Sequence, residues 1–108
     1  MQDSKYIVIL STAASVEEAA KIAEHLVSSH LVACVNLVPG IQSVYWWNGA
    51  VQKDQEVLMI IKTLREKFDD VKSAILSLHS YDVPEIISLP VENGFNDYLL
   101  WIEKTLRK

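Results

Sequence analysis

Residues 33–63 have the sequence ACVNLVPGIQSVYWWNGAVQKDQEVLMIIKT, which predicts one long β-hairpin. Two apolar runs rich in Val, Ile, Tyr and Trp flank Asn48-Gly49, the dipeptide that best tolerates the positive φ angles of a type I′ turn. A straight arm from Val32 to Trp47 would extend about 50 Å at roughly 3.3 Å per residue. Because a compact domain of this size has a radius of gyration of about 13 Å, we expect the hairpin to bend or to leave the domain.

Pro39-Gly40 marks the expected position of the bend. Pro39 lacks an N–H for the strand ladder, and Gly40 permits a bulge. The outer half of the hairpin carries Tyr45, Trp46 and Trp47, which would be an aggregation hazard if they stayed exposed. We therefore expect another subunit to cover this half, so self-assembly is the first inference.

The composition predicts a single ordered domain over residues 1–108. The chain is 50% hydrophobic and 22% charged, with three Gly and three Pro, which favours a packed core over disorder. The formal net charge is −4, and the Lys and Arg residues are scattered. This pattern argues against a phosphate-binding surface, so no nucleic-acid partner is expected.

The same features predict a cellular location. One cysteine, Cys34, cannot form an internal disulfide, and no signal-peptide pattern opens the chain. The longest apolar runs, at 6–10 and 57–61, are far shorter than the roughly 20 residues needed to span a bilayer. We expect a soluble cytoplasmic protein with no membrane partner.

Hydrophobic periodicity predicts the remaining elements. Residues 6–10 form a β-branched run typical of a central strand. A helix begins after Ser15 with a capping box, in which Ser15 accepts from the Glu18 N–H and the Glu18 carboxylate reaches back. A second helix is predicted from an apolar stripe formed by Leu64, Phe68, Val71, Ile75 and Leu78. A break at 79–84, a strand at 85–91, a turn at 93–94 and a last helix lined by residues 98–106 complete the chain.

This order, β-α-β-β-α-β with an added C-terminal helix, predicts an α+β fold of the ferredoxin-like type. One antiparallel sheet would be backed by two helices, which leaves its other face open. The strands are nevertheless apolar on consecutive residues, as at 57–61. Homo-oligomerisation is the commonest way to cover such a face.

Four motifs resemble the CutA divalent-cation tolerance family. They are ACVNLVPGIQSVYWWNG at 33–49, EVLMIIKT at 56–63, HSYDVPE at 79–85 and YLLW at 98–101. The resemblance covers essentially the whole chain. It implies a homotrimer of ferredoxin-like subunits, with the long hairpins paired across subunits and the sheets packed around a threefold axis. It also implies a role in tolerance of copper and other divalent cations, without an obligatory cofactor.

The resemblance implies metal binding at His79, whose imidazole suits copper or zinc. Bacterial relatives with a proposed copper site have a Cys where this chain has Ser11, and a second His where it has Leu78. A hydroxyl and an aliphatic group cannot replace a thiolate and an imidazole for a soft ion. Weak binding of copper or another divalent cation is therefore expected. The alternative is that His79 only caps a helix C-terminus, where the dipole favours it.

The resemblance also implies a cleft between neighbouring subunits, lined by Lys62, Tyr81, Glu85, Glu56 and Trp47. A cation, a phenol and a carboxylate that converge there would orient a small anionic or zwitterionic ligand. The alternative is an inter-subunit ion pair of Lys62 with Glu85 or Glu56 that locks the trimer.

The remaining reactive residues favour structural roles. Cys34 lies on a predicted strand with Asn36 on the same side, and a free cysteine usually packs in a core. His25 and His30 lie about 140° apart around a helix and cannot share a metal. Both are expected at the surface.

The chain has no G-x-S-x-G elbow, no Gly-rich phosphate loop and no H-E-x-x-H motif. A nucleophile pair of Cys34 and His79 would have no third orienting group. We therefore expect a binding protein and not an enzyme. Two alternatives stay open: a trimeric small-molecule sensor of the PII kind that uses the inter-subunit clefts, and a stable scaffold that anchors another protein.

Overall fold

The computed structural model of the chain describes residues 4–107. The elements follow in the order β1 (Tyr6–Ala13), α1 (Val16–Ser28), β2 (Cys34–Trp47), β3 (Ala50–Leu64), the short 3₁₀ helix η1 (Arg65–Lys67), α2 (Phe68–Leu78), β4 (Ile86–Pro90) and α3 (Asn96–Leu106). The predicted α+β class and element order are confirmed. Among the helices of residues 4–107, none is long and apolar enough to cross a membrane.

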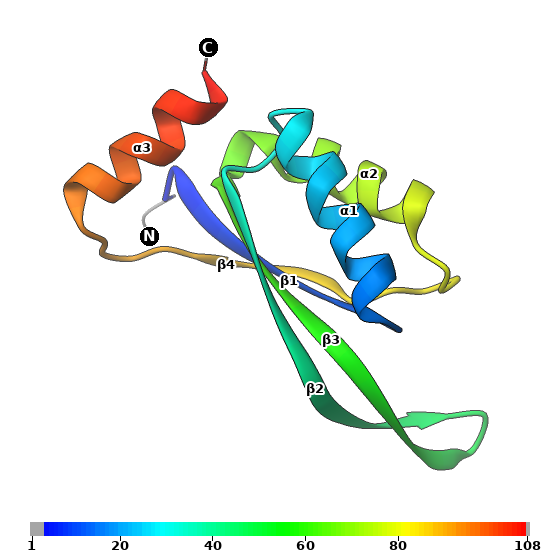
Figure 1. Cartoon of the computed structure of the whole chain (residues 1–108). Coiled ribbons are helices and arrows are strands. Elements are labelled where there is room, and N and C mark those ends of the chain that lie inside the picture. Colours follow the sequence, from blue (N-terminus) through cyan, green and yellow to red (C-terminus); the bar gives the residue numbers. More distant parts are fainter. Residues whose placement is uncertain (1–3, 108) are drawn as a thin grey trace.

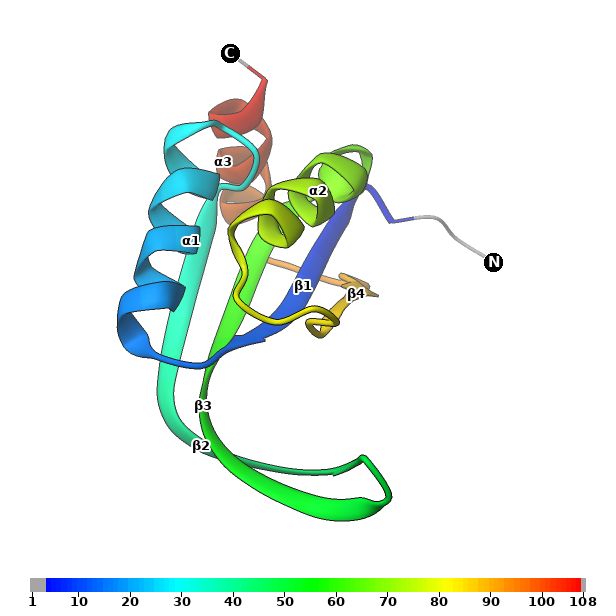
Figure 2. The same ribbon diagram turned by 90° about the vertical axis from the view of Figure 1, so that its right-hand side faces the viewer.

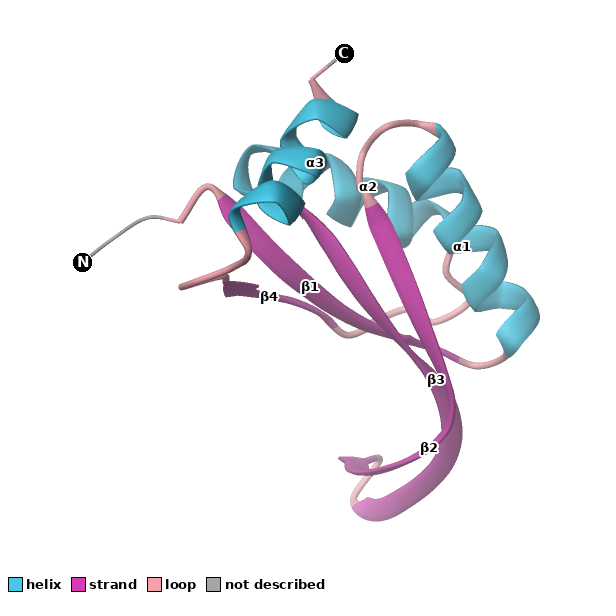
Figure 3. Cartoon of the chain, turned by 60° about the vertical axis from the view of Figure 1, so that its left-hand side comes forward, coloured by secondary structure: helices cyan, strands magenta, loops and turns pink. Residues whose placement is uncertain are grey.

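The four strands form one antiparallel sheet in the order β2-β3-β1-β4. Helices α1 and α2 cover one face, and α3 lies against the other (Figure 1 and Figure 3). The face under α1 and α2 carries the main core, which includes Ile9, Met59 and Ile61 from the central strands with Ile22 and Ile75 from the helices. Strand alternation therefore separates a packed face from a largely open one.

The long hairpin has the predicted turn and bend. Asn48 and Gly49 both have positive φ, at 52° and 74°. The β2–β3 register shifts between Val38 and Ile41, on either side of Pro39 and Gly40. The outer half of the hairpin leaves the plane of the sheet and curves back beneath the connection from α2 to β4 (Figure 2).

The open face of the sheet is apolar, as expected. In the paired rows, Leu10 lies between Ile60 of β3 and Ile87 of β4, while Val8 lies next to Leu89. These side chains are half-buried or exposed in the single chain. Helix α3 covers only the end remote from the hairpin, where its buried Ile102 and Leu106 cluster with Ala33, Leu64 and Tyr6.

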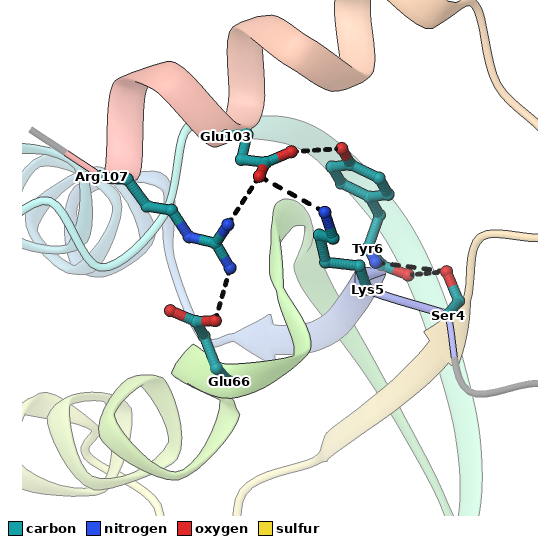
Figure 4. A network of polar contacts seen from close by, with 6 residues as sticks. All are labelled: Ser4, Lys5, Tyr6, Glu66, Glu103 and Arg107. Carbon is teal, nitrogen blue, oxygen red and sulfur yellow. Dashed lines mark hydrogen bonds and ion pairs between the residues drawn. The ribbon is translucent and has the colours of Figure 1, made fainter.

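A charged network fixes α3 in this position (Figure 4). The Arg107 guanidinium contacts Glu66 of η1 at 2.6 Å and Glu103 at 2.5 Å. Glu103 also accepts from the Tyr6 hydroxyl at 2.7 Å and pairs with Lys5 at 3.4 Å. One carboxylate therefore ties the last helix to the start of β1.

Three local predictions were wrong. Leu64 does not open the second helix, because it pairs with Tyr6 at the end of β3 and η1 precedes α2. Leu78 is 42% exposed and does not share the buried stripe of Val71 and Ile75. The Ser15 side chain does accept from the Glu18 N–H, but the Glu18 carboxylate reaches back to the Ala14 N–H instead of the Ser15 N–H and also binds Ser80.

Candidate functional site

One pocket of the described chain, the hairpin pocket, lies between the curved hairpin and the connection from α2 to β4. Its volume is about 570 Å³, within the usual range of small-molecule sites. The lining residues are Thr12, Ser43, Val44, Tyr45, Trp47, Glu56, Tyr81, Asp82, Val83 and Glu85. The bend at Pro39-Gly40 forms the pocket, because a straight hairpin would carry Tyr45 and Trp47 away from the body.

Glu56 and Tyr81 form the inner wall of the hairpin pocket. Glu56 lies at the base of the bent part of β3 and is only 9% exposed. The Tyr81 hydroxyl donates to Glu56 Oε2 at 2.7 Å. Burial, followed by this hydrogen bond to a carboxylate, raises the pKa of Tyr81 far above its ordinary value. Tyr81 is therefore a neutral donor at every physiological pH.

His79 supports this wall from behind. Its Nε2 lies 2.6 Å from the carbonyl oxygen of Thr12 and must donate, while Nδ1 accepts the Tyr81 N–H at 3.0 Å. These two bonds fix the neutral Nε2–H tautomer. The ring centroids of His79 and Tyr81 are 4.6 Å apart. The imidazole is fully buried and positions Tyr81 against the end of β1.

The Glu18 carboxylate anchors the same turn. It accepts the Ser80 N–H at 2.6 Å, the Ser80 hydroxyl at 3.1 Å and the Ala14 N–H at 3.4 Å. Its Oε2 lies 3.7 Å from His79 Nδ1. Burial raises the pKa of Glu18, but the Ser80 and Ala14 hydrogen bonds outweigh burial and lower it overall. The sequence signal for Glu18 was the capping box, which gave no sign of the long-range partner.

The sequence of this chain matches a known protein family and its relatives. The family described as CutA1 divalent ion tolerance protein matches residues 7–105. The chain belongs to the CutA1 family. A divalent-cation tolerance protein CutA of Thermus thermophilus is 45% identical over 97 residues, which cover 90% of this chain and 94% of that protein. The chloroplastic CutA 1 of rice is 44% identical over 102 residues, and the match spans 94% of this chain but only 58% of the rice protein.

Solved CutA structures have the same fold. The CutA of Archaeoglobus fulgidus, described as periplasmic, superposes with a TM-score of 0.92 at 41% identity, covering 94% of this chain and 99% of that one. The rice CutA1 structure gives a TM-score of 0.94 at 43% identity, covering 97% and 96%. The α+β fold is therefore that of CutA1 proteins.

The residues expected at a CutA copper site do not form a cluster here. Ser11 is fully buried on the face beneath the helices, and its hydroxyl has no hydrogen-bond partner within residues 4–107. Leu78 faces outward at the end of α2, and both ring nitrogens of His79 are engaged. In the described part of the chain, no three His, Cys, Asp or Glu residues come together as a metal cluster.

The hairpin pocket of a single chain is lined by four of the five expected cleft residues, namely Trp47, Glu56, Tyr81 and Glu85. The fifth, Lys62, lies on the open face of the sheet. It pairs with Cys34 in the strand register, and its Nζ contacts Asn36 Oδ1 and lies 3.9 Å from Cys34 Sγ.

The thiol of Cys34 is half-buried and neighbours the Tyr98 hydroxyl. Burial, followed by proximity to Cys34, raises the pKa of Tyr98. Cys34 and Lys62 thus lie on the open face of the sheet, whereas His79 lies behind the hairpin pocket.

Proposed function

We propose that this protein acts in tolerance of divalent cations as a cytoplasmic homotrimer of ferredoxin-like subunits, with weak direct binding of copper or another divalent cation. The observation that carries the proposal is membership of the CutA1 family, whose relatives are named for divalent-cation tolerance. The chemistry is binding and not catalysis.

Trimer formation is supported by the open sheet face and by the hairpin tip. Trp46 and Trp47 are 69% and 54% exposed in one chain, and Ile87 and Leu89 are about as exposed. Apolar surface removed from water contributes about 25 cal/mol per Å², so three copies that share these surfaces gain stability. We expect sedimentation equilibrium to give three times the 12.2 kDa of one chain. A single-chain mass at low micromolar concentration would contradict the trimer.

Weak metal binding at His79 follows from its hydrogen bonds. A cation can reach either ring nitrogen only by displacing the bond to Thr12 or to Tyr81, and each displacement subtracts from the binding free energy. Copper also prefers nitrogen and sulfur ligands, whereas the groups around this turn are mainly carboxylates and hydroxyls.

Calorimetric titration with Cu(II) tests this part of the proposal. We expect micromolar or weaker affinity that is lost in His79→Ala and retained in His30→Ala, since His30 is an exposed histidine outside the site. Equal affinity in wild type and His79→Ala would exclude His79 as a ligand.

A second candidate function, small-molecule sensing, is favoured by the volume of the hairpin pocket. Likeness to PII trimers is an analogy of architecture only. A thermal-shift screen of metabolites tests it, with a rise in melting temperature as the expected result. If no metabolite changes the melting temperature and one protein co-purifies stoichiometrically, the anchoring scaffold is favoured.

A further inference from the structure

The hairpin pocket of the single chain carries negative charge, whereas the cleft expected between subunits would also contain the cation of Lys62. An anionic or zwitterionic ligand was expected because Lys62 would supply a cation, but Lys62 lies on the open sheet face beside Asn36 and Cys34. The residues that line the pocket include no Lys, Arg or His. They include the carboxylates of Glu56, Asp82 and Glu85. The pocket of a single chain is therefore built for positive charge.

The Glu56 carboxylate is the strongest single indication. The residue is 9% exposed, and within residues 4–107 its carboxylate accepts from the Tyr81 hydroxyl through Oε2. Among the described residues, Oε1 is not one of the buried atoms that lack a partner, so it reaches solvent. The Tyr81 hydroxyl orients Oε2, so Oε1 is left for an occupant of the pocket.

The negative field of the pocket extends to its outer wall. The Tyr45 hydroxyl donates to Asp54, and this bond, burial and the nearby charge of Glu56 raise the pKa of Tyr45. The charges of Glu56 and Asp54 also add to the raised pKa of Tyr81. Two phenols from different elements thus respond to the same group of carboxylates.

Aromatic side chains supply the other half of the recognition chemistry. Tyr45, Trp47 and Tyr81 line the pocket together with the carboxylates. The negative face of a Trp or Tyr ring attracts a nearby cation, and quaternary ammonium groups are the usual ligands of such aromatic walls. A hydrated divalent metal ion would make no use of these rings.

We propose that the hairpin pocket binds a small organic ammonium ion, with the cationic nitrogen between Glu56 and the aromatic walls. The inference rests on the second candidate function, because it names the ligand class of the same pocket. It is independent of copper binding at His79, so the copper titration succeeds or fails separately.

Choline is the probe, and its uncharged carbon analogue, 3,3-dimethyl-1-butanol, is the matched control. Calorimetry and the indole N–H resonance of Trp47 report on binding. We expect choline to bind and to shift the Trp47 resonance, while the neutral analogue binds at least about tenfold more weakly. Glu56→Gln should weaken choline binding at least about tenfold, because the substitution keeps the acceptor for Tyr81 but removes the charge. Glu85→Gln should act in the same direction.

Glu92→Gln removes the same charge from an exposed position after β4 and should bind choline as wild type does. Three results would overturn the proposal. The first is equal binding of choline and its neutral analogue. The second is no choline binding to the wild type at about 10 mM, a concentration at which a Kd corresponds to a binding free energy of about 3 kcal/mol. The third is choline binding that appears only in Lys62→Met. The last result would mean that the lysine of a second copy already occupies the pocket.

Discussion

The Glu18 carboxylate joins the start of α1 to a turn 62 residues away by accepting from Ser80. Because the net pKa of Glu18 is lowered below its ordinary 4.5, its charged form stabilises the folded state. Such stability is fully present above the unfolded pKa and is lost as pH falls through the folded pKa. We therefore expect Glu18→Gln to lower the free energy of unfolding by about 1–2 kcal/mol at pH 7, and the difference from wild type to shrink below about pH 4.5.

Urea unfolding at pH 7 and at pH 3 measures this effect. Glu17→Gln is the control, because Glu17 is exposed on the same turn of α1 and has no resolved contact to Ser80. If both variants lose the same stability at both pH values, Glu18 has no special part in holding the turn.

Ser11 presents the opposite case of a buried polar group without a partner. Its hydroxyl lies among the core residues under α1 and α2, opposite Met59 in the strand register. An unpaired buried hydroxyl costs roughly 1–3 kcal/mol. Ser11→Ala should therefore raise the free energy of unfolding by about 1 kcal/mol, measured by chemical denaturation. A loss of stability would mean that the Ser11 hydroxyl has a partner, such as a bound water.

At the scale of elements, α1 ends with a left-handed residue that is not glycine. His30 has φ 59°, and the bonds from His30 N–H to Val27 and from Leu31 N–H to Leu26 form a Schellman motif. A left-handed non-glycine residue costs about 1 kcal/mol. We expect His30→Gly to raise the free energy of unfolding by about 1 kcal/mol, measured by thermal or urea unfolding. His25→Gly, inside α1, should instead destabilise by a few tenths of a kcal/mol.

The hairpin shows why elements were predictable and their contacts were not. The turn follows from the positive φ angles that Asn48-Gly49 tolerates, and the bend follows from the missing N–H of Pro39 beside Gly40. Both effects are local, so the sequence predicted the turn and the bend. Leu64 fits both a helical stripe and a strand end, and only its pairing with Tyr6 and its contact with α3 decide between them.

The candidate site was predictable to the same limited degree. Glu56, Tyr81 and Glu85 meet around one pocket of the single chain, whereas the resemblance implied that they line a cleft between subunits. The direction in which Lys62 points depends on strand register, and the engagement of both His79 nitrogens depends on Thr12, 67 residues away. Pairings of this kind depend on the packing of distant segments, which local sequence patterns do not encode.

At the scale of the whole molecule, the pocket and the proposed assembly use opposite sides of strand β2 in the hairpin. The bend brings Tyr45 and Trp47 over the hairpin pocket of their own chain, while Trp46 alternates to the other side of β2 and stays exposed. One strand thus supplies a pocket wall on one side and, in the proposed trimer, a surface for another subunit on the other. Substitution at Trp46 should therefore affect assembly more than it affects choline binding.

The open sheet face gives the decisive test of assembly. Leu10 lies at its centre, between Ile60 and Ile87, so a charge there would be buried without a partner in a trimer but solvated in a single chain. If the proposed trimer forms, we expect Leu10→Asp to convert it to single chains in sedimentation equilibrium. Val27→Asp, on the exposed side of α1, adds the same charge and should leave the mass unchanged. A trimeric Leu10→Asp would show that subunits associate through the hairpins alone, with the sheet face still in contact with water.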